Sequence, residues 1–267
     1  MRLIALALMT ALAAPAVAQA QQQAALPTRT GLSMEMPTLQ EDQALLAAVS
    51  STARSEADRA RDVFRHPHES LTFWGLRPGL TVVEVQPGNG GWWTAILHPY
   101  AEATGGSYVA AANLAALEAA EPGAADMVLI ARAFHNWARA PGRTDAVLAA
   151  AFKALKPGGI LAVEQHRAAE GRTAADTAAT GYVPESYVVA AAEAAGFVLE
   201  ARSDVNANPA DDHMHPYGVW SLKPTRVSAP REGQAQDRPT PLTPEERAEL
   251  DAIGESDRMT LRFRKPE

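Results

Sequence analysis

Between residues 80 and 205, short apolar runs alternate with longer segments of helical period, and this alternation limits the folds open to the chain. The clearest apolar runs are Leu80–Val85, Asp126–Ala131 and Ile160–Val163. The segments with a helical period are Thr94–Ala103, Asp145–Leu155 and Tyr187–Ala195. Strands that are apolar at nearly every position are typical of a parallel sheet with helices on both faces. The alternation therefore predicts a doubly wound parallel sheet.

The last two predicted strands follow a different pattern. Phe197–Val205 and Arg258–Arg264 lack a helical period between them, which predicts that they pair antiparallel. In Arg258–Arg264 the apolar residues alternate with Thr260 and Arg262, so this segment is predicted to be an edge or antiparallel strand with one solvated face. A weaker strand is predicted at Ser107–Ala112. The predicted fold class is α/β, with a Rossmann-like, mostly parallel sheet and an antiparallel last strand.

The first residues have the pattern of a cleaved signal peptide, predicted at residues 1–20. Arg2 precedes the apolar run Leu3–Ala13, and small residues follow at Ala16–Ala20. The chain is therefore expected to be periplasmic or secreted. No later apolar run reaches about 18 residues, so no membrane span is expected after cleavage.

The remaining chain is expected to form one domain after a flexible lead. The lead is predicted at residues 21–38, and the domain, with helices at its start, at residues 39–267. A polar, proline-rich insertion at about residues 206–257 is a candidate lid, with Trp220 packing it down. Thr243, Pro244 and Glu246 predict the start of a short helix within this insertion.

Composition narrows the classes of partner and chemistry. The net charge of −7 without a lysine and arginine cluster argues against nucleic acid as a partner. The chain has no cysteine, which excludes disulfides, thiolate metal sites and a cysteine nucleophile. A small-molecule substrate is expected, and the sequence leaves the oligomeric state open.

The segment VVEVQPGNGGW, residues 82–92, predicts a buried strand that runs into a glycine-rich turn. Glu84 lies late in the strand, and Gly88, Gly90 and Gly91 follow it. Glycines allow the backbone to approach a ligand closely, and the next helix offers free N–H groups to the polar end of that ligand. In the alternative interpretation, Glu84 only caps the turn and the glycines only permit close helix packing.

Several segments in order resemble the class I S-adenosylmethionine-dependent methyltransferases, and more narrowly a group of exported methyltransferases. The resemblance covers roughly residues 60–266. It depends on VVEVQPGNGGWWTAIL, DMVLIARAFHNW, LKPGGILAVEQHRA, GYVPESYVVAAAEAAGF and SDRMTLRFRKP. By this resemblance S-adenosylmethionine is the expected cofactor, with Glu84 near its ammonium group and the glycines under its ribose. The residues implied in cofactor binding are Glu84, Gln86, Pro87, Gly88, Asn89, Gly90 and Asn113.

The chain departs from the pattern of this family at three places. Gln86 stands where the family has a glycine, and the turn has one extra residue before Trp92. Asn113 stands where the family has an acidic residue that binds the ribose hydroxyls. The segment from Asn113 to Asp126 is too short for the helix, strand and helix that the family has there. A smaller sheet, open on the adenine side, is therefore expected.

Polar side chains at the predicted carboxyl ends of the strands are candidates for catalysis, because ligands of open α/β sheets bind beyond these ends. His135 and His166 follow neighbouring strands, and either imidazole is a candidate general base. Tyr182 is placed over the acceptor pocket as a further catalytic candidate. For this tyrosine a role in helix entry is the open alternative.

A second hypothesis treats the same rim as the site of a divalent transition metal. Imidazole-rich sets suit zinc, copper or nickel. The candidate ligands are His135, His166, His213 and His215, with Asp211 or Asp212. Two functions therefore stay open: a methyltransferase for a small molecule, and a non-catalytic periplasmic protein that binds a metal or a small molecule on a methyltransferase scaffold.

Overall fold

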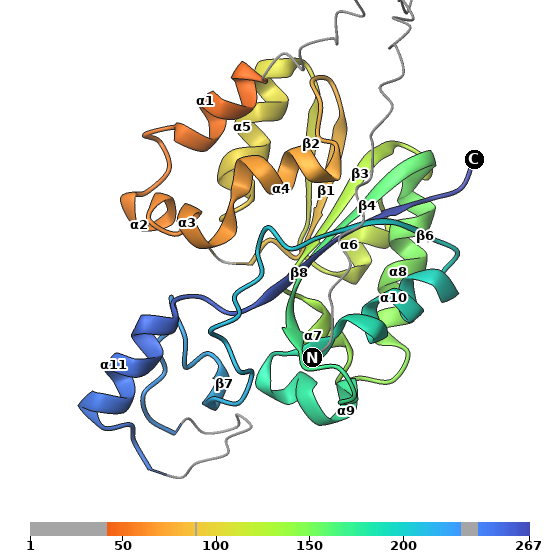
Figure 1. Cartoon of the computed structure of the whole chain (residues 1–267). Helices are drawn as coiled ribbons and strands as arrows, with labels where there is room; N and C mark the ends of the chain where they lie inside the picture. Colours follow the sequence, from red (N-terminus) through yellow and green to blue (C-terminus); the bar gives the residue numbers. More distant parts are fainter. Residues whose placement is uncertain (1–41, 89, 231–239) are drawn as a thin grey trace, which may run out of the picture. The chain divides into compact units, whose positions relative to one another are not determined.

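The computed structural model describes residues 42–88, 90–230 and 240–267. The predicted signal peptide, the predicted lead and Asn89 lie outside these residues. A seven-stranded sheet forms the centre, in the order β2-β1-β3-β4-β8-β6, with β5 paired to β4 (Figure 1). The strands of this sheet are β1 (Thr81–Val85), β2 (Ser107–Ala111), β3 (Ala125–Ala131), β4 (Leu155–Ala168), β5 (Val183–Pro184), β6 (Val198–Ser203) and β8 (Arg258–Arg264). A further short strand, β7 (Pro216–Val219), is not among them.

Most strands run parallel, and the chain reverses its direction of growth across the sheet at β1. From β1 the chain moves outward to β2, and it then returns to the other side of β1 to form β3. β3 pairs parallel with β4, whereas β8 pairs antiparallel with both β4 and β6. The fold is therefore the predicted doubly wound, mostly parallel sheet with an antiparallel last strand.

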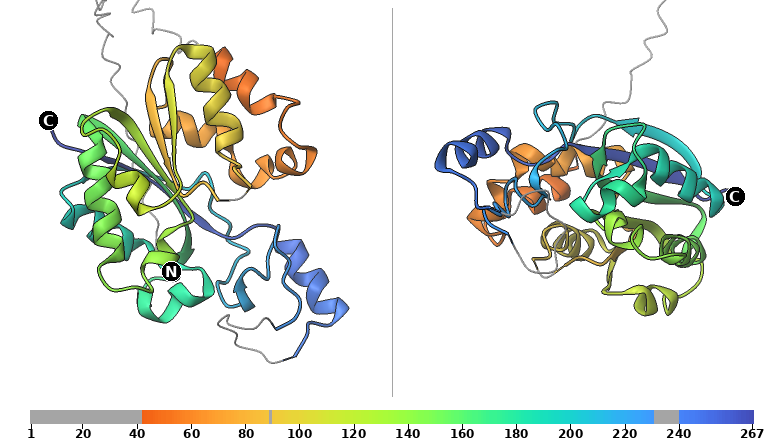
Figure 2. Two further views of the ribbon diagram at one scale, coloured as in Figure 1. Left: turned by 180° about the vertical axis from the view of Figure 1, so that it is seen from behind. Right: turned by 90° about the horizontal axis from the view of Figure 1, so that it is seen from below.

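Helices cover both faces of the sheet, because the strand side chains alternate between two apolar clusters. Val82 of β1 and Met127 of β3 pack with α1, α4 and α5, whereas Val83 and Val128 pack with α8 and α10. Figure 2 shows these two groups of helices on opposite sides of the sheet. The helices are α1 (Gln43–Ser50), α2 (Glu56–Arg59), α3 (Asp62–Arg65), α4 (Pro67–Trp74), α5 (Thr94–Thr104), α6 (Leu114–Glu118), α7 (Phe134–Trp137), α8 (Arg143–Ala154), α9 (Ala174–Thr177), the 3₁₀ turn η1 (Ala178–Thr180), α10 (Glu185–Ala194) and α11 (Pro244–Ile253).

The first helical segment is broken, as its irregular apolar spacing indicates. Ser55 caps α2 by accepting a hydrogen bond from the backbone N–H of Asp58. His66 has a left-handed backbone with φ of 39°, and Pro67 begins α4 directly after it. Gly75, with φ of 82°, ends α4. These breaks turn the chain so that Arg61 and Arg65 reach the carboxyl end of the sheet.

Two details differ from the sequence-based expectation. β4 begins at Leu155, because this residue pairs with Ala125 before a register shift. β8 lies between β4 and β6, and its predicted solvated face is buried at Arg258 and Thr260 but half-exposed at Arg262 and Arg264. The alternation of β8 was misleading because buried carboxylates neutralise the Arg258 side chain, which therefore does not need water.

Residues 206–257 contain regular structure. β7 and α11 lie in this stretch, and Thr243 begins α11 with the predicted capping box to Glu246. No helix among the described residues has the length and apolar character that a membrane crossing requires.

Candidate active site

A cavity of about 470 Å³ lies at the carboxyl ends of β1, β3 and β4. Its volume falls in the range of roughly 300–1,000 Å³ that is typical of small-molecule sites. The position is the one expected for ligands in an open α/β sheet, because the strand order reverses between β1 and β3. The cavity is lined by Arg61, Arg65, Gln86, Pro87, Gly88, Ala112, Ala131, Arg132, Ala133, His135, Asn136, His166, Val219, Trp220, Lys223, Pro224, Thr225, Glu255 and Ser256.

The turn after β1 contributes three of the predicted cofactor residues to this lining: Gln86, Pro87 and Gly88. Gln86 has a left-handed backbone with φ of 50°, and its side-chain oxygen accepts a hydrogen bond of 3.1 Å from Nε1 of Trp137. Gly88 has φ of 73°, and a Cβ added there would meet no atom within 4 Å. The backbone at Gly88 therefore borders open space in which a ligand can approach it closely.

The other described cofactor candidates, Glu84, Gly90 and Asn113, are not among the residues that line this cavity. The buried Glu84 carboxylate accepts hydrogen bonds from Oγ1 of Thr94 at 2.8 Å and from the hydroxyl of Tyr108 at 2.7 Å. Burial raises the pKa of Glu84, although both hydrogen bonds act against this change. Asn113 caps α6 by accepting a hydrogen bond from the N–H of Ala116.

The structure brings His135 and His166 together at the cavity, with ring centroids 6.0 Å apart. Nδ1 of His166 lies 2.6 Å from Oγ of Ser256. Burial lowers the pKa of His135 to about 4, with help from two nearby arginines. Burial also places the pKa of His166 well below its usual value. Both imidazoles are therefore neutral at pH 7, and both are weak bases.

Tyr182 lies outside the cavity lining, behind His166. The two ring centroids are 6.2 Å apart, and the Tyr182 hydroxyl donates to Asp211 at 3.1 Å. Burial and the charge of Asp211 raise the pKa of Tyr182. This hydroxyl therefore fixes the chain around Asp211.

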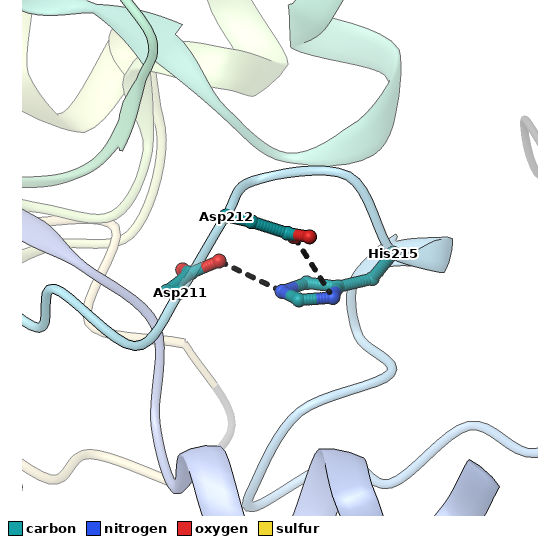
Figure 3. Close-up of side chains that lie close together, drawn as sticks. All are labelled: Asp211, Asp212 and His215. Carbon is teal, nitrogen blue, oxygen red and sulfur yellow. Dashed lines mark hydrogen bonds and ion pairs between the residues drawn. The ribbon is translucent and has the colours of Figure 1, made fainter.

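His215 lies in a separate cluster with Asp211 and Asp212 (Figure 3). Nε2 of His213 lies nearby, 3.3 Å from Asp257. His215 is placed between two carboxylates, with Nε2 at 2.7 Å from Asp211 and Nδ1 at 3.6 Å from Asp212. Asp211 also accepts hydrogen bonds from the backbone N–H groups of His213 and Asp257. The cluster thus ties the start of the 206–257 stretch to its end.

The four histidines of the metal hypothesis do not form one ligand set. Among the described residues, the group whose candidate ligand atoms lie within 4.8 Å of one another is Asp211, Asp212 and His215. The Asp211 carboxylate and both nitrogens of His215 already face partners inside the protein. Hydrogen bonding and ion pairing account for this cluster without a metal.

Sequence reasoning missed a network of arginines and glutamates beside the cavity. Glu255 is its centre: it pairs with Arg61 at 2.7 Å, with Arg65 at 2.8 Å and with Arg258 at 2.9 Å. Burial alone would raise the pKa of Glu255, but these arginines lower it to about 2. Glu255 is therefore ionised throughout the physiological pH range.

Glu164, near the end of β4, is the second carboxylate of the network. It lies 3.2 Å from Nη1 of Arg258 and 3.9 Å from Nε of Arg132, and Nε1 of Trp93 donates to it at 3.1 Å. Burial acts to raise the pKa of Glu164, but the charges of Arg258 and Arg132 outweigh it and lower the pKa. In the sequence, this network is visible as the arginines in β8 and after β3. Their carboxylate partners are distant in the chain, so local pattern did not reveal the pairing.

Comparisons with known proteins give matches among solved structures alone. No family model matches the chain, and no curated protein matches it. A chain of a Haloferax volcanii complex that contains the Trm112 methyltransferase activator is 14% identical, with a TM-score of 0.45 over 79% of this chain and 93% of that one. The [4+2]-cyclase SpnF is 16% identical, with a TM-score of 0.42 over 78% and 80% of the two chains. A SAM-dependent methyltransferase from Aquifex aeolicus is 19% identical, with a TM-score of 0.43 over 56% of this chain and 89% of that one.

Proposed function

We propose that the protein is an exported S-adenosylmethionine-dependent methyltransferase that acts on a small molecule. The observation that carries this proposal is the cavity at the reversal of strand order, bordered by the glycine turn after β1. The resemblance of the ordered sequence segments to class I methyltransferases supports the choice of cofactor. The signal-peptide pattern of residues 1–20 supports export to the periplasm or the medium.

The cavity fits a ligand of this kind at the turn, where Gly88 leaves open space beside the backbone. Gln86, Pro87 and Gly88 would hold the cofactor, which supplies the methyl group when it is bound. The neutral imidazoles of His135 and His166 orient an acceptor by hydrogen bonds, and either can receive a proton from it. Trp220, with its ring centroid 6.0 Å from that of His135, forms part of the wall on this side.

The experiment that tests the proposal is calorimetric titration of the purified protein with S-adenosylmethionine and S-adenosylhomocysteine. We expect both to bind at or below about 1 mM, the upper end of common Michaelis constants. We expect Gly88→Val to abolish binding, because the branched side chain would enter the ligand space. Gly123→Val is the matched control, since Gly123 also has a positive φ and no atom within 4 Å of an added Cβ. Absence of binding to both compounds at this concentration would refute the cofactor assignment.

A second candidate function is a non-catalytic protein that binds a small molecule on the same scaffold. The observation that favours it is the low pKa of His135, about 4, which makes this residue a weak general base at pH 7. Incubation with methyl-labelled S-adenosylmethionine and an extract of periplasmic small molecules separates the two functions. Label recovered in a new small molecule supports the methyltransferase, and binding without any label transfer supports the binding protein.

A further inference from the structure

The cavity is lined by more positive than negative side chains. Arg61, Arg65, Arg132 and Lys223 line it, and Glu255 is the carboxylate in its lining. The whole chain has the opposite sign, with a net charge of −7. The positive charge is therefore concentrated at this place in an otherwise acidic protein.

The carboxylates of the network do not neutralise its arginines. Four guanidinium groups, those of Arg61, Arg65, Arg132 and Arg258, share Glu164 and Glu255. Glu255 has three of them as close partners, and Glu164 pairs closely with Arg258. Arg132 is left with a distance of 3.9 Å from Glu164, which is beyond hydrogen bonding. Asp58, 3.9 Å from Nη1 of Arg61, is a third carboxylate beside the network, so the four guanidinium charges exceed the carboxylate charges by one.

Three of these arginines, Arg65, Arg132 and Arg258, also have buried donors without acceptors. Arg65 is 1% exposed, and its buried Nη1 has no hydrogen-bond partner among the described residues. Its guanidinium lies against the ring of Trp92, 4.8 Å from the centroid, which fixes its orientation. Nε of Arg132 is likewise buried and without a hydrogen-bond partner. Arg65 and Arg132 both line the cavity, and buried polar groups are rarely left without a partner in a folded protein.

The backbone also holds Arg132 in an unusual conformation. Its φ of 56° is in the left-handed region, which residues with a side chain rarely adopt. Its N–H donates to the carbonyl of Glu164 at 2.7 Å, which keeps this conformation at the end of β3. A residue held in this way directly beside a cavity is typical of a binding site.

We propose that the ligand of this cavity carries an anionic group, a carboxylate or a phosphate, which Arg132 and Arg65 bind. The planar guanidinium matches both groups with paired N–H donors, and a desolvated arginine binds them more selectively than a lysine does. The group has two chemical sources: the methyl acceptor, or the amino-acid carboxylate of the cofactor. If the methyl acceptor supplies the group, this inference rests on the proposed methyltransferase function. Binding of an anion by Arg132 and Arg65 does not depend on that function.

The test uses inorganic phosphate as the probe, by thermal unfolding and calorimetric titration against sodium chloride of equal ionic strength. We expect phosphate to raise the melting temperature of the wild-type protein. Arg132→Gln should weaken phosphate binding at least about tenfold, which corresponds to about 1.4 kcal/mol. Arg132 makes no side-chain hydrogen bond to another described residue, so this variant removes none. Equal phosphate responses in wild type and Arg132→Gln would overturn the proposal.

Two further variants separate site binding from a general salt effect. Arg172→Gln removes the same charge from an exposed arginine outside the cavity lining, and it should respond to phosphate as the wild type does. Arg132→Lys keeps the charge but loses the planar fork, and it should bind phosphate more weakly than the wild type and more tightly than Arg132→Gln. A loss in Arg172→Gln as large as in Arg132→Gln would contradict a specific site.

The source of the anionic group is decided with S-adenosylhomocysteine and 5′-methylthioadenosine, which lacks the amino-acid carboxylate. If S-adenosylhomocysteine displaces phosphate, and Arg132→Gln removes its advantage over 5′-methylthioadenosine, the cofactor supplies the anion. If phosphate and S-adenosylhomocysteine bind together, the acceptor supplies it. Phosphate binding without any binding of the adenosyl compounds supports the anion site and refutes the proposed function. Binding of the adenosyl compounds with no effect of phosphate or of Arg132→Gln supports the proposed function and refutes the anion site.

Discussion

At the scale of single residues, Gln86 and Arg132 share an unusual feature. Each follows a parallel strand, lines the cavity and has a left-handed backbone, with φ of 50° and 56°. For residues with a Cβ this conformation costs about 1 kcal/mol. In both cases a hydrogen bond from the residue's own N–H, to Ala111 or to Glu164, holds the backbone in place. The free-energy cost of these two left-handed residues therefore falls at the reversal of strand order, where the candidate site lies.

Because of this conformation at Gln86, a glycine variant should be more stable than an alanine variant, which inverts the usual order. Gln86→Ala should destabilise the protein by about 1–3 kcal/mol, because Nε1 of Trp137 loses its buried acceptor. Gln86→Gly loses the same acceptor but relieves the left-handed strain, so it should be more stable than Gln86→Ala by about 1 kcal/mol. Urea unfolding of the two variants measures the difference. If the alanine variant is the more stable one, Gln86 is not strained.

Sequence reasoning located some of the site residues and missed others for a physical reason. Gly88 and His135 follow apolar strands directly, so local pattern was sufficient to place them at the cavity. The role of Glu255 depends on Arg61, which is 194 residues away in the chain. A partner at such a distance leaves no local pattern, and the arginines of β8 therefore read as solvated.

At the scale of elements, β7 packs tightly against the turn before β5. Gly218 of β7 has φ of 58°, and a Cβ added there would lie 2.3 Å from the carbonyl oxygen of Thr180. A Cβ at Gly181 would lie 2.3 Å from Cγ1 of Val219. These glycines allow the close approach that positions Val219 and Trp220 in the cavity wall.

Gly218→Ala should therefore destabilise the protein at the cavity wall more than the addition of one methyl group usually does. The left-handed backbone and the backbone clash together predict a loss of about 2 kcal/mol or more. Gly123→Ala is the control, because Gly123 has a similar φ of 65° but open space, and it should lose only about 1 kcal/mol. Unfolding measurements give the two values, and limited proteolysis shows whether cleavage within residues 206–257 increases in Gly218→Ala alone. Similar losses in both variants would show that the contact with Thr180 is not tight.

The type and order of the elements could be predicted well because they depend on local apolar period. The predicted strands at Leu80–Val85 and Asp126–Ala131 agree with β1 and β3 within one residue at each end. The position of β8 inside the sheet could not be predicted in the same way. It is decided by pairing with β4 and β6, and its alternating pattern was compatible with an edge.

At the scale of the whole molecule, the two buried histidines make stability depend on pH. Burial depresses the pKa values of both in the folded protein, to about 4 for His135 and well below the usual value for His166, whereas unfolded histidine titrates near 6.5. A depressed pKa means that the stability contribution is complete above about pH 6.5 and is lost as the pH falls toward the folded value. The pKa of His213 is raised by its hydrogen bond to Asp257, so this residue acts in the opposite sense.

The expected result is a marked loss of stability between pH 7 and pH 5. His135 should contribute about 2 kcal/mol to the loss, since one pKa unit corresponds to about 1.4 kcal/mol, and His166 acts in the same direction. His135→Gln should reduce the pH dependence by this amount, whatever its effect at pH 7. Urea unfolding of both proteins at several pH values provides the measurement. An unchanged pH dependence in His135→Gln would show that His135 titrates normally in the folded protein.

The central position of β8 has a consequence for how the native sheet is assembled. Until residues 258–264 insert between β4 and β6, both of those strands present unpaired backbone groups along one edge. The pairs that β8 makes with β4, such as Ile160 with Arg264, join residues far apart in the chain, and such contacts form slowly. Folding intermediates in which β8 is not yet paired would therefore expose two unpaired strand edges, through which they self-associate at high protein concentration. By pairing with both strands, β8 removes these edges and so protects the folded sheet from edge-to-edge association.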